Sequence, residues 1–425
     1  MQRFFSSNYN RSVLLLIFSA LSLLVLLGRG VILTVRGLLA LSSSEVEFSG
    51  LGTYVVDALS MVLCAGLLIP LLMDCIRMLQ GKEIPTANLK TVKGRFLLIL
   101  AILWVILVVV SSLLTGLFDF GWLLSSPAFI LAIFIPVAAL TWIGAGGLAS
   151  GSRRRLWAAF SLGMTGSTGL ALVLEYFLIG VAAIIGAVAV AFRPEWISSL
   201  QDLQSQVENA KNVEELLTSL APTLVQPWVF LLLLAFTAGL GPLIEEAVKP
   251  LAVWALGRSL RSPAEGFALG ALSGAGFALL EGLMAASGMV ETPYFGLPAR
   301  LASSLMHITL SGLMGWGIAS AFLEKRWKRL FGIYALVAAL HGLWNGSALL
   351  AVYGSLRFVV HEMSYDLVGI LSMVTGVTLL GLVFVLIAIG LPTLNRRMQP
   401  GQSDIIAPLA SQPERTPDGL DSQSS

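Results

Sequence analysis

The 425-residue sequence predicts an all-α protein, a polytopic bundle of about ten transmembrane helices. Hydrophobic residues make up 56% of the chain and charged residues 12%, a balance that excludes an ordinary soluble globular protein. Apolar runs long enough to span a bilayer recur along the chain, and Lys and Arg gather in alternate loops between them. Because the basic residues lie beside apolar spans, the net charge of +2 gives no support for a nucleic-acid partner.

The ten spans follow from the apolar runs and the residues that flank them. The first, residues 12–34, is preceded by Arg3 and Arg11 as a signal peptide would be, but its length and the parity of the later spans favour a retained membrane helix. The other spans are expected near residues 53–75, 95–117, 127–149, 160–192, 227–257, 264–287, 300–323, 330–352 and 366–392.

Basic residues between the spans predict the orientation of the chain. Loops rich in Lys and Arg face the cytoplasm. The basic segments are 77–95, 153–155, 258–261, 325–329 and 396–397. Both termini are then cytoplasmic, in a multi-pass protein of the cell (plasma) membrane, with Arg29 and Arg36 as the main exception.

Composition divides the chain into five parts. In the loop after the fifth span, apolar residues from Trp196 to Leu220 recur at helical spacing, which predicts an amphipathic helix on the outer membrane face, as a cap or as a substrate gate. After Leu394 the chain is rich in Pro, Gln, Ser, Gly and Asp, which predicts disorder. The parts are an N-terminal transmembrane region of about five spans (1–192), the extracytoplasmic amphipathic loop (193–226), a four-span core (227–353), the last transmembrane helix with its preceding loop (354–394) and a cytoplasmic tail (395–425).

The segment Gly241–Pro250 places two adjacent carboxylates, Glu245 and Glu246, and the ammonium of Lys249 inside an apolar span. Ionisable groups at membrane depth are costly and indicate a functional site. Lys249 follows the glutamates by four and three residues, so its ammonium can reach either of them. One carboxylate suffices for that pairing, and the other suits a general base. The glycines before Pro242 predict a helix that breaks and restarts there.

The three spans that follow add polar groups to the same region. They contribute Glu281, then His307, then His341 with Asn345 one turn further on. The first five spans hold almost nothing comparable, and we expect Asp57 and Glu175 there to pair locally or lie at helix ends. We therefore predict one site, made by four consecutive helices. Small residues at four-residue spacing also predict close packing of the helix that carries Glu281: Gly266, Gly270, Gly274, Ala278 and Gly282.

A carboxylate base, imidazoles and an amide donor are the groups that water attack on a carbonyl requires. No Gly-x-Ser-x-Gly motif competes with this interpretation. His307 taken alone also fits an ordinary interhelical hydrogen bond. Buried carboxylates and histidines build proton relays as well, so a proton-coupled transporter is the alternative of another class, although a relay would also place polar groups in the first five spans. A catalytically inactive scaffold is a third alternative.

These residues form ordered motifs that resemble the PrsW family of intramembrane proteases, distant relatives of the CAAX prenyl proteases. The motifs are Glu245-Glu-Ala-Val-Lys249, Phe277-Ala-Leu-Leu-Glu281, His307 and His341-Gly-Leu-Trp-Asn345. They lie between about Trp228 and Tyr353, under a third of the chain. The resemblance implies an intramembrane endopeptidase that hydrolyses peptide bonds of membrane-anchored proteins such as anti-sigma factors.

The resemblance also implies roles for single residues. Glu245 is similar to the water-activating base, and Glu246 to the partner of Lys249. His341 and Asn345 match the residues that polarise the carbonyl and hold the oxyanion. The position of these groups in the middle to outer part of the spans predicts cleavage toward the extracytoplasmic side.

The metal requirement stays open at the level of sequence. Glu281 can orient the water, share a proton with Glu245 or bind a metal. A glutamate-type hydrolase needs no cofactor, and this mechanism is favoured because the chain lacks the His-Glu-x-x-His spacing of many zinc enzymes. The family has carried a metallopeptidase label, so a Zn²⁺ enzyme is the alternative; its ligands would come from Glu245, Glu246, Glu281, His307 and His341.

Overall fold

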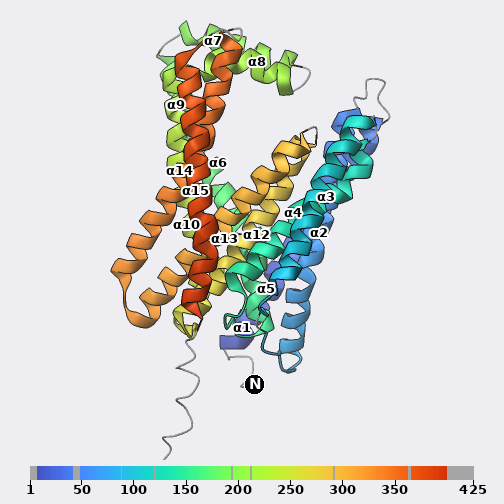
Figure 1. The fold of residues 1–425 in the computed structure, drawn as a ribbon, viewed down its shortest axis with the longest axis vertical. Coiled ribbons are helices and arrows are strands. Elements are labelled where there is room, and N and C mark those ends of the chain that lie inside the picture. Colours follow the sequence, from blue (N-terminus) through green and yellow to red (C-terminus); the bar gives the residue numbers. More distant parts are fainter. Residues whose placement is uncertain are drawn as a thin grey trace, which may run out of the picture.

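The structure is a computed structural model that describes residues 7–41, 48–87, 89–118, 121–192, 195–210, 213–290, 292–361 and 365–399. Every element in these residues is helical, and ten helices are long and apolar enough to cross a membrane. The predicted all-α bundle of about ten spans is therefore confirmed. The bundle is elongated, with α1 beginning and α15 ending at the same end (Figure 1).

The first half of the chain supplies five spans and the cap that follows them. A π-helical turn, η2 (Leu162–Ser167), joins two helices into the fifth span. The helices are α1 (Ser7–Leu41), α2 (Phe48–Leu79), α3 (Gly94–Leu117), α4 (Gly121–Ala145), α5 (Arg153–Ser161), α6 (Thr168–Ala191), α7 (Glu195–Asn209) and α8 (Val213–Leu224).

The second half supplies the remaining five spans, the first of which is assembled from several short helices. A second π-helical turn, η3 (Ala235–Leu240), and a 3₁₀ turn, η4 (Gly257–Ser259), belong to it. The helices are α9 (Pro227–Leu234), α10 (Gly241–Val248), α11 (Leu251–Leu256), α12 (Pro263–Ala286), α13 (Pro293–Glu324), α14 (Trp327–Val360) and α15 (Leu367–Met398).

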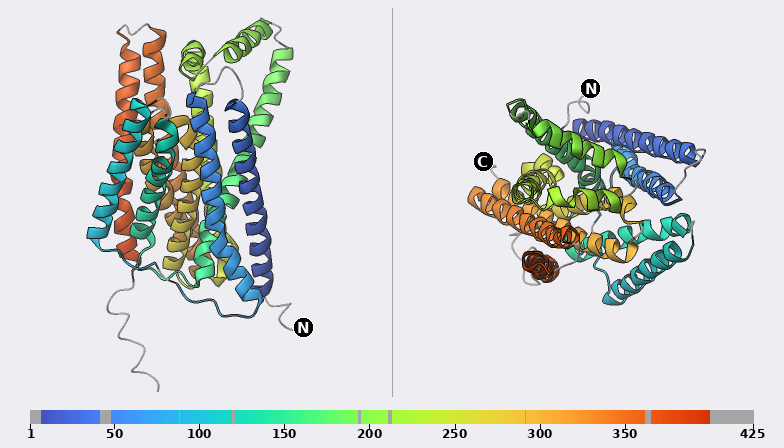
Figure 2. Two further views of the ribbon diagram at one scale, coloured as in Figure 1. Left: turned by 90° about the vertical axis from the view of Figure 1, so that its right-hand side faces the viewer. Right: turned by 90° about the horizontal axis from the view of Figure 1, so that it is seen from above.

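Helices α12 and α13 form the centre of the bundle, with the other spans around them (Figure 2). Almost all of α12 is buried. A Cβ atom on Gly266, Gly270 or Gly274 would come within 2.4, 2.3 and 2.5 Å of atoms of α13. No side chain larger than hydrogen fits there, so this part of the predicted small-residue face is confirmed as a close helix contact.

The rod formed by α9, η3 and α10 does not break at Pro242, contrary to the sequence prediction. The N–H of Gly241 donates to the carbonyl of Phe236, a π-helical bond, and Pro242 has no N–H to lose. This register leaves the carbonyl of Thr237 without its helical donors, and the side-chain amide of Asn345 donates to it at 2.9 Å. The π turn thus absorbs the proline without ending the helix.

The true interruption comes one turn later, at Lys249 and Pro250. Helix α10 ends at Val248, and α11 starts again at Leu251. The freed carbonyl of Lys249 accepts hydroxyl hydrogen bonds from Ser167 at 3.0 Å and Ser273 at 2.5 Å. Two other spans therefore hold the backbone at this residue.

The outer cap also differs from its prediction. Residues 195–220 were expected to form one amphipathic helix, and the structure has two helices, α7 and α8, lying across one end of the bundle (Figure 1). Helix α8 packs on α14, where Tyr353 donates to the carbonyl of Val225 at 3.4 Å. These contacts fit a cap on the bundle.

At the other end, α15 continues to Met398, past the predicted boundary at residue 394. Asn395 explains the extension, because its amide donates to the carbonyls of Gly144 and Gly146 at 2.8 and 3.0 Å. The last turn of α15 is therefore tied to the end of α4. Residues 400–425, most of the predicted tail, lie outside the described residues.

Candidate active site

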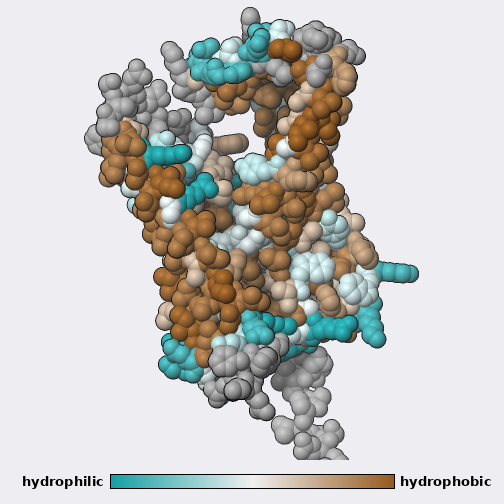
Figure 3. All heavy atoms as spheres, turned by 180° about the vertical axis from the view of Figure 1, so that it is seen from behind, coloured by the Kyte–Doolittle hydropathy of each residue, from teal (hydrophilic) through white to brown (hydrophobic). Residues whose placement is uncertain are grey.

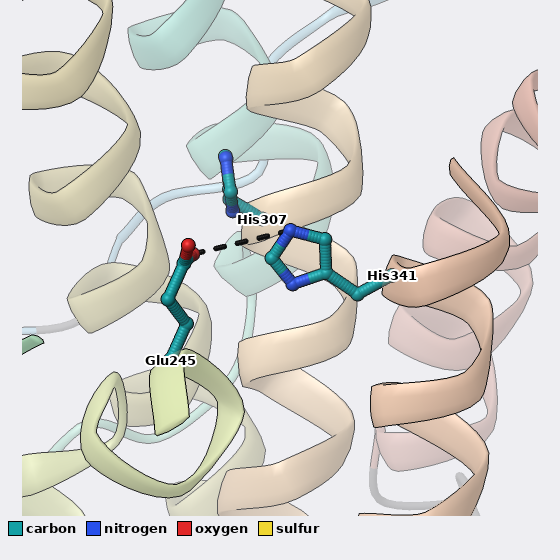
Figure 4. Close-up of side chains that lie close together, drawn as sticks. All are labelled: Glu245, His307 and His341. Carbon is teal, nitrogen blue, oxygen red and sulfur yellow. Dashed lines mark ion pairs between the residues drawn. The ribbon is translucent and has the colours of Figure 1, made fainter. Parts of the chain in front are cut away.

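The structure brings the predicted polar residues of four spans into one cluster. Three of them face one another from α10, α13 and α14 in the close-up view (Figure 4). The cluster consists of Glu245, Glu246 and Lys249 at the end of α10, Glu281 of α12, His307 of α13 and His341 of α14. Asn345 is linked to the same region through the backbone of Thr237.

The ammonium of Lys249 is the centre of the cluster. Its Nζ atom lies 2.9 Å from Glu245 Oε2, 2.7 Å from Glu246 Oε1 and 2.7 Å from His307 Nδ1. The contacts with Glu246 and His307 are hydrogen bonds, and the contact with Glu245 is an ion pair. The side chain is fully buried, and the ring of Phe277 lies 4.7 Å from Nζ. Lys249 therefore provides a fixed positive charge shared by both glutamates.

Glu246 and His341 form a second, fully buried pair. Glu246 is 0% exposed, and its Oε1 atom lies 2.9 Å from His341 Nδ1. A carboxylate only accepts hydrogen bonds, so Nδ1 of His341 carries the proton that it donates to Glu246. In the neutral ring, Nε2 is then an acceptor.

Glu245 differs from Glu246 in exposure and in what it faces. Its side chain is 18% exposed, and Oε2 lies 3.9 Å from His341 Nε2 (Figure 4). Two acceptors at this separation do not hydrogen-bond directly, but one water can donate to both. The geometry is therefore suited to positioning a water molecule.

Glu281 and His307 form a third part of the cluster. Glu281 Oε2 lies 2.7 Å from His307 Nε2, and Oε1 accepts from Arg300 at 2.9 Å. Lys249 donates to Nδ1 of His307, so the ring proton lies on Nε2, which faces the Glu281 carboxylate. Both ring nitrogens of His307 are thus occupied, and Glu281, 37% exposed, is the most accessible acid of the cluster.

Arg300 and Glu175 are neighbours of the site that the sequence analysis missed. Arg300 lies on α13 two turns before His307, but the predicted span started at residue 300 and placed it at the membrane boundary. Glu175 was expected to pair locally or lie at a helix end, yet its Oε1 lies 3.9 Å from where a Cβ on Gly241 would stand. Glu175 is the single acid in α6, which is a signal that it has a partner, but the sequence does not show which helix it faces.

The cluster also has the donor types of a metal site. Ligand atoms of Glu245, His307 and His341 lie within 4.8 Å of one another, and two imidazoles with a glutamate are a donor set of catalytic zinc. However, the Lys249 ammonium already contacts Glu245 and His307 in this arrangement. A divalent cation would lie beside that buried charge and compete for a ring nitrogen of His307 that already has a partner. The donor types fit a metal, but their arrangement does not, and we derive no step through one.

A cluster of ionisable groups within the spans of an apolar helical bundle is typical of a functional site in a membrane protein, such as that of a membrane-embedded enzyme. The chain belongs to the PrsW family: the model of this family, described as PrsW family intramembrane metalloprotease, matches residues 151–389. The protein is therefore an intramembrane peptidase of membrane-protein substrates in a lipid environment, and the transporter alternative is set aside.

The family match is wider than the motifs that suggested it. It begins at α5 and includes α6, η2 and most of α15, whereas the motifs lie between Trp228 and Tyr353. Ser167 and Glu175, which approach the site from this added region, fall within it. Comparisons with curated proteins and with solved structures find no match.

Proposed function

We propose that the protein is an endopeptidase that cleaves membrane-anchored proteins with water activated by Glu245. The observation that carries the proposal is the 3.9 Å distance between Glu245 Oε2 and His341 Nε2, two acceptors that one water can bridge by donating to both. Glu246 and Lys249 hold the two acceptors in position, since Glu246 orients the ring of His341 and Lys249 contacts both carboxylates. Anti-sigma factors are the substrate class that the family resemblance suggests.

In the proposed reaction, Glu245 takes one proton from the water while the oxygen forms a bond to the peptide carbonyl carbon. His341 Nε2 holds the other proton of that water. The second N–H of the Asn345 amide, one turn along α14, is our candidate donor to the developing oxyanion. When the C–N bond breaks, Glu245 returns its proton to the leaving nitrogen. Protons and electrons balance without a cofactor.

Accessibility supports cleavage toward the extracytoplasmic side. Glu281 stands about 27 Å along α12 from Pro263, where that helix leaves the basic end of the bundle. Glu245 and Glu281 are the acids of the cluster with exposed surface. The space-filling view shows a hollow in the half of the bundle beneath α7 and α8 (Figure 3). A substrate segment entering there would meet these two carboxylates first.

The distribution of charge supports the proposed orientation in the cell membrane. The first and last described turns of the bundle lie at one end, together with the basic residues of the intervening loops (Figure 2). By the positive-inside rule, we propose that both termini are cytoplasmic and that α7–α8 lies outside.

A zinc-dependent mechanism is the second candidate, favoured by the donor cluster of Glu245, His307 and His341 and by the description of the family. It requires Lys249 to give up its contacts with Glu245 and His307 when the metal binds. The two mechanisms therefore differ in the cation of the site, which is the Lys249 ammonium in the first and Zn²⁺ in the second.

The experiment is cleavage of a tagged single-pass substrate by the purified full-length protein in detergent micelles. Glu245→Gln and His341→Ala are expected to reduce the rate at least a hundredfold. Glu324→Gln, an exposed acid paired with Arg326 and Arg329, is the control and should cleave at the wild-type rate. Cleavage that survives both site substitutions would overturn the assignment, and a cut mapped to the cytoplasmic flank of the substrate would contradict the proposed side.

A further inference from the structure

A cavity of 330 Å³ lies at the basic end of the bundle, where α1, α5 and α11 meet. Its volume falls within the range of about 300–1,000 Å³ that is usual for ligand sites. None of the active-site residues lines it.

Three guanidinium groups line this cavity, and two of them have no acidic partner among the described residues. Arg155 forms an ion pair with Glu265 at 2.7 Å. Arg11 donates instead to the hydroxyl of Ser259, at 3.3 Å, and Arg154 to the hydroxyl of Ser12. Each guanidinium has five N–H donors, so most of those on Arg11 and Arg154 are left for a ligand. The cavity therefore carries two uncompensated positive charges.

The rest of the lining is apolar. Leu14 and Phe18 of α1 form one wall, Leu162 of η2 the floor, and Leu251 and Ala255 of α11 the other wall. Leu14 is 66% exposed on a helix that spans the membrane, so the cavity opens on the lipid-facing surface. A ligand that satisfies both features needs an anionic head and a hydrocarbon tail.

We propose that this cavity binds an anionic phospholipid. Its phosphate lies between Arg11 and Arg154, where bidentate guanidinium bonds are available, and one acyl chain lies between α1 and α11. Basic pockets between transmembrane helices are suited to such head groups. The charge of the cavity favours an anionic lipid over a zwitterionic one, and its apolar lining favours a lipid over a soluble phosphate.

The chain itself contains one competing occupant. The C-terminal segment beyond the described residues carries four acids, Asp404, Glu414, Asp418 and Asp421. Replacing all four by their amides in the full-length chain tests this segment. Phosphatidylglycerol affinity is expected to stay within twofold of wild type; a gain of tenfold or more would identify the tail as the occupant and overturn the proposal.

The main experiment titrates lipid-depleted, full-length protein in detergent with phosphatidylglycerol, phosphatidylcholine or glycerol phosphate, and counts bound molecules by native mass spectrometry. Wild type is expected to bind one phosphatidylglycerol with preference and neither of the other two. Arg11→Gln/Arg154→Gln should weaken this binding roughly thirtyfold, about fivefold for each charge. Lys82→Gln/Lys328→Gln, which removes two exposed lysines outside the cavity, should leave it within twofold.

A second variant separates binding from folding. Ala255→Phe fills the apolar side of the cavity and keeps all three guanidiniums. It is expected to lose phosphatidylglycerol binding while its unfolding temperature without lipid stays that of wild type. Equal weakening of phosphatidylglycerol binding by the double arginine and double lysine substitutions would overturn the proposal. Binding of glycerol phosphate as strong as that of the lipid would overturn it as well.

Discussion

At the scale of single residues, the site is organised by the ammonium of Lys249, because this one buried charge contacts both glutamates and His307. Without it, two carboxylates would share a low-dielectric space, which is costly. The lysine therefore determines whether Glu245 and Glu246 can both be ionised and near each other. We propose that its role is to position these acids, and not to react with the substrate.

Substitution of Lys249 by Met tests this role. The change keeps the approximate length of the side chain and removes the charge, which leaves the two neighbouring carboxylates without their shared cation. We expect a loss of about 3–5 kcal/mol in the free energy of unfolding and complete loss of cleavage. Lys82→Met, at an exposed lysine, is the matched control. Wild-type stability in Lys249→Met would contradict the central place given to the ammonium.

Substitutions of the two glutamates are predicted to affect stability and catalysis differently. Glu246 is fully buried and bonded to Lys249 and His341, so Glu246→Gln should cost about 1.5–3 kcal/mol of unfolding free energy and lower activity with it. Glu245→Gln, at a partly exposed side chain, should abolish cleavage with a smaller loss of stability. Thermal unfolding of both variants in one detergent gives the comparison. The reverse order would exchange the roles of the two residues.

Sequence reasoning identified the acids and imidazoles of the site, because isolated polar groups in apolar spans are conspicuous. It did not identify Arg300 or Glu175 as their neighbours. Helix α13 begins at Pro293, seven residues before the predicted start of the span, so Arg300 was taken to lie at the membrane boundary. Whether Glu175 approaches the site depends on which face α6 turns toward α10. Helix rotation is set by packing between elements, and a single sequence does not record it.

At the scale of elements, the π turn η3 decides how the glutamates are presented. Glycine and proline at residues 241–242 were taken as a break, and this was wrong, since the shifted hydrogen bonds keep the rod continuous. Two residues of α14 contact the turn. The amide of Asn345 donates to the carbonyl of Thr237, and a Cβ atom on Gly342 would lie only 2.2 Å from the carbonyl oxygen of Ala238. No local sequence signal distinguishes such a π turn from a break.

Gly342→Ala is therefore expected to disturb the site although glycine has no reactive group. The added methyl would collide with the Ala238 carbonyl and push α14, which carries His341, away from α10. We predict at least a tenfold fall in cleavage rate, since displacements of about 1 Å are that costly.

The control lies on the same helix. A Cβ on Gly332 has nothing within 4 Å, so Gly332→Ala should keep full activity and gain up to about 1 kcal/mol in stability. Equal activities of the two alanine variants would show that the contact between α14 and η3 does not matter.

At the scale of the whole molecule, composition and periodicity were sufficient for the fold class and for all ten spans. They were insufficient for the ends of the helices, because these depend on tertiary contacts such as that of Asn395 with α4. The amphipathic pattern of residues 195–220 was detected, but its division into α7 and α8 was not. Hydrophobic patterns thus specify which segments are helical, and tertiary contacts with neighbouring helices determine where each helix ends.

The proposed orientation can be tested with single cysteines. Both native cysteines, Cys64 and Cys75, are buried and should not react. Lys328→Cys lies at the basic end and Ser205→Cys on α7, and both positions are exposed. In intact cells, a membrane-impermeant maleimide should label Ser205→Cys alone, and lysis should expose Lys328→Cys. The opposite pattern would invert the topology and place the hollow beneath α7–α8 in the cytoplasm.

The central claim is that the cation of this active site is the ammonium of Lys249 and that Glu245 activates the water without a metal. The most direct measurement is the cleavage rate of wild-type protein stripped of metal by chelation, with residual zinc quantified by mass spectrometry in the same sample. We predict the full rate at less than about one zinc per ten chains, and no increase when zinc is returned. Loss of cleavage on stripping, restored by stoichiometric zinc, would contradict the account.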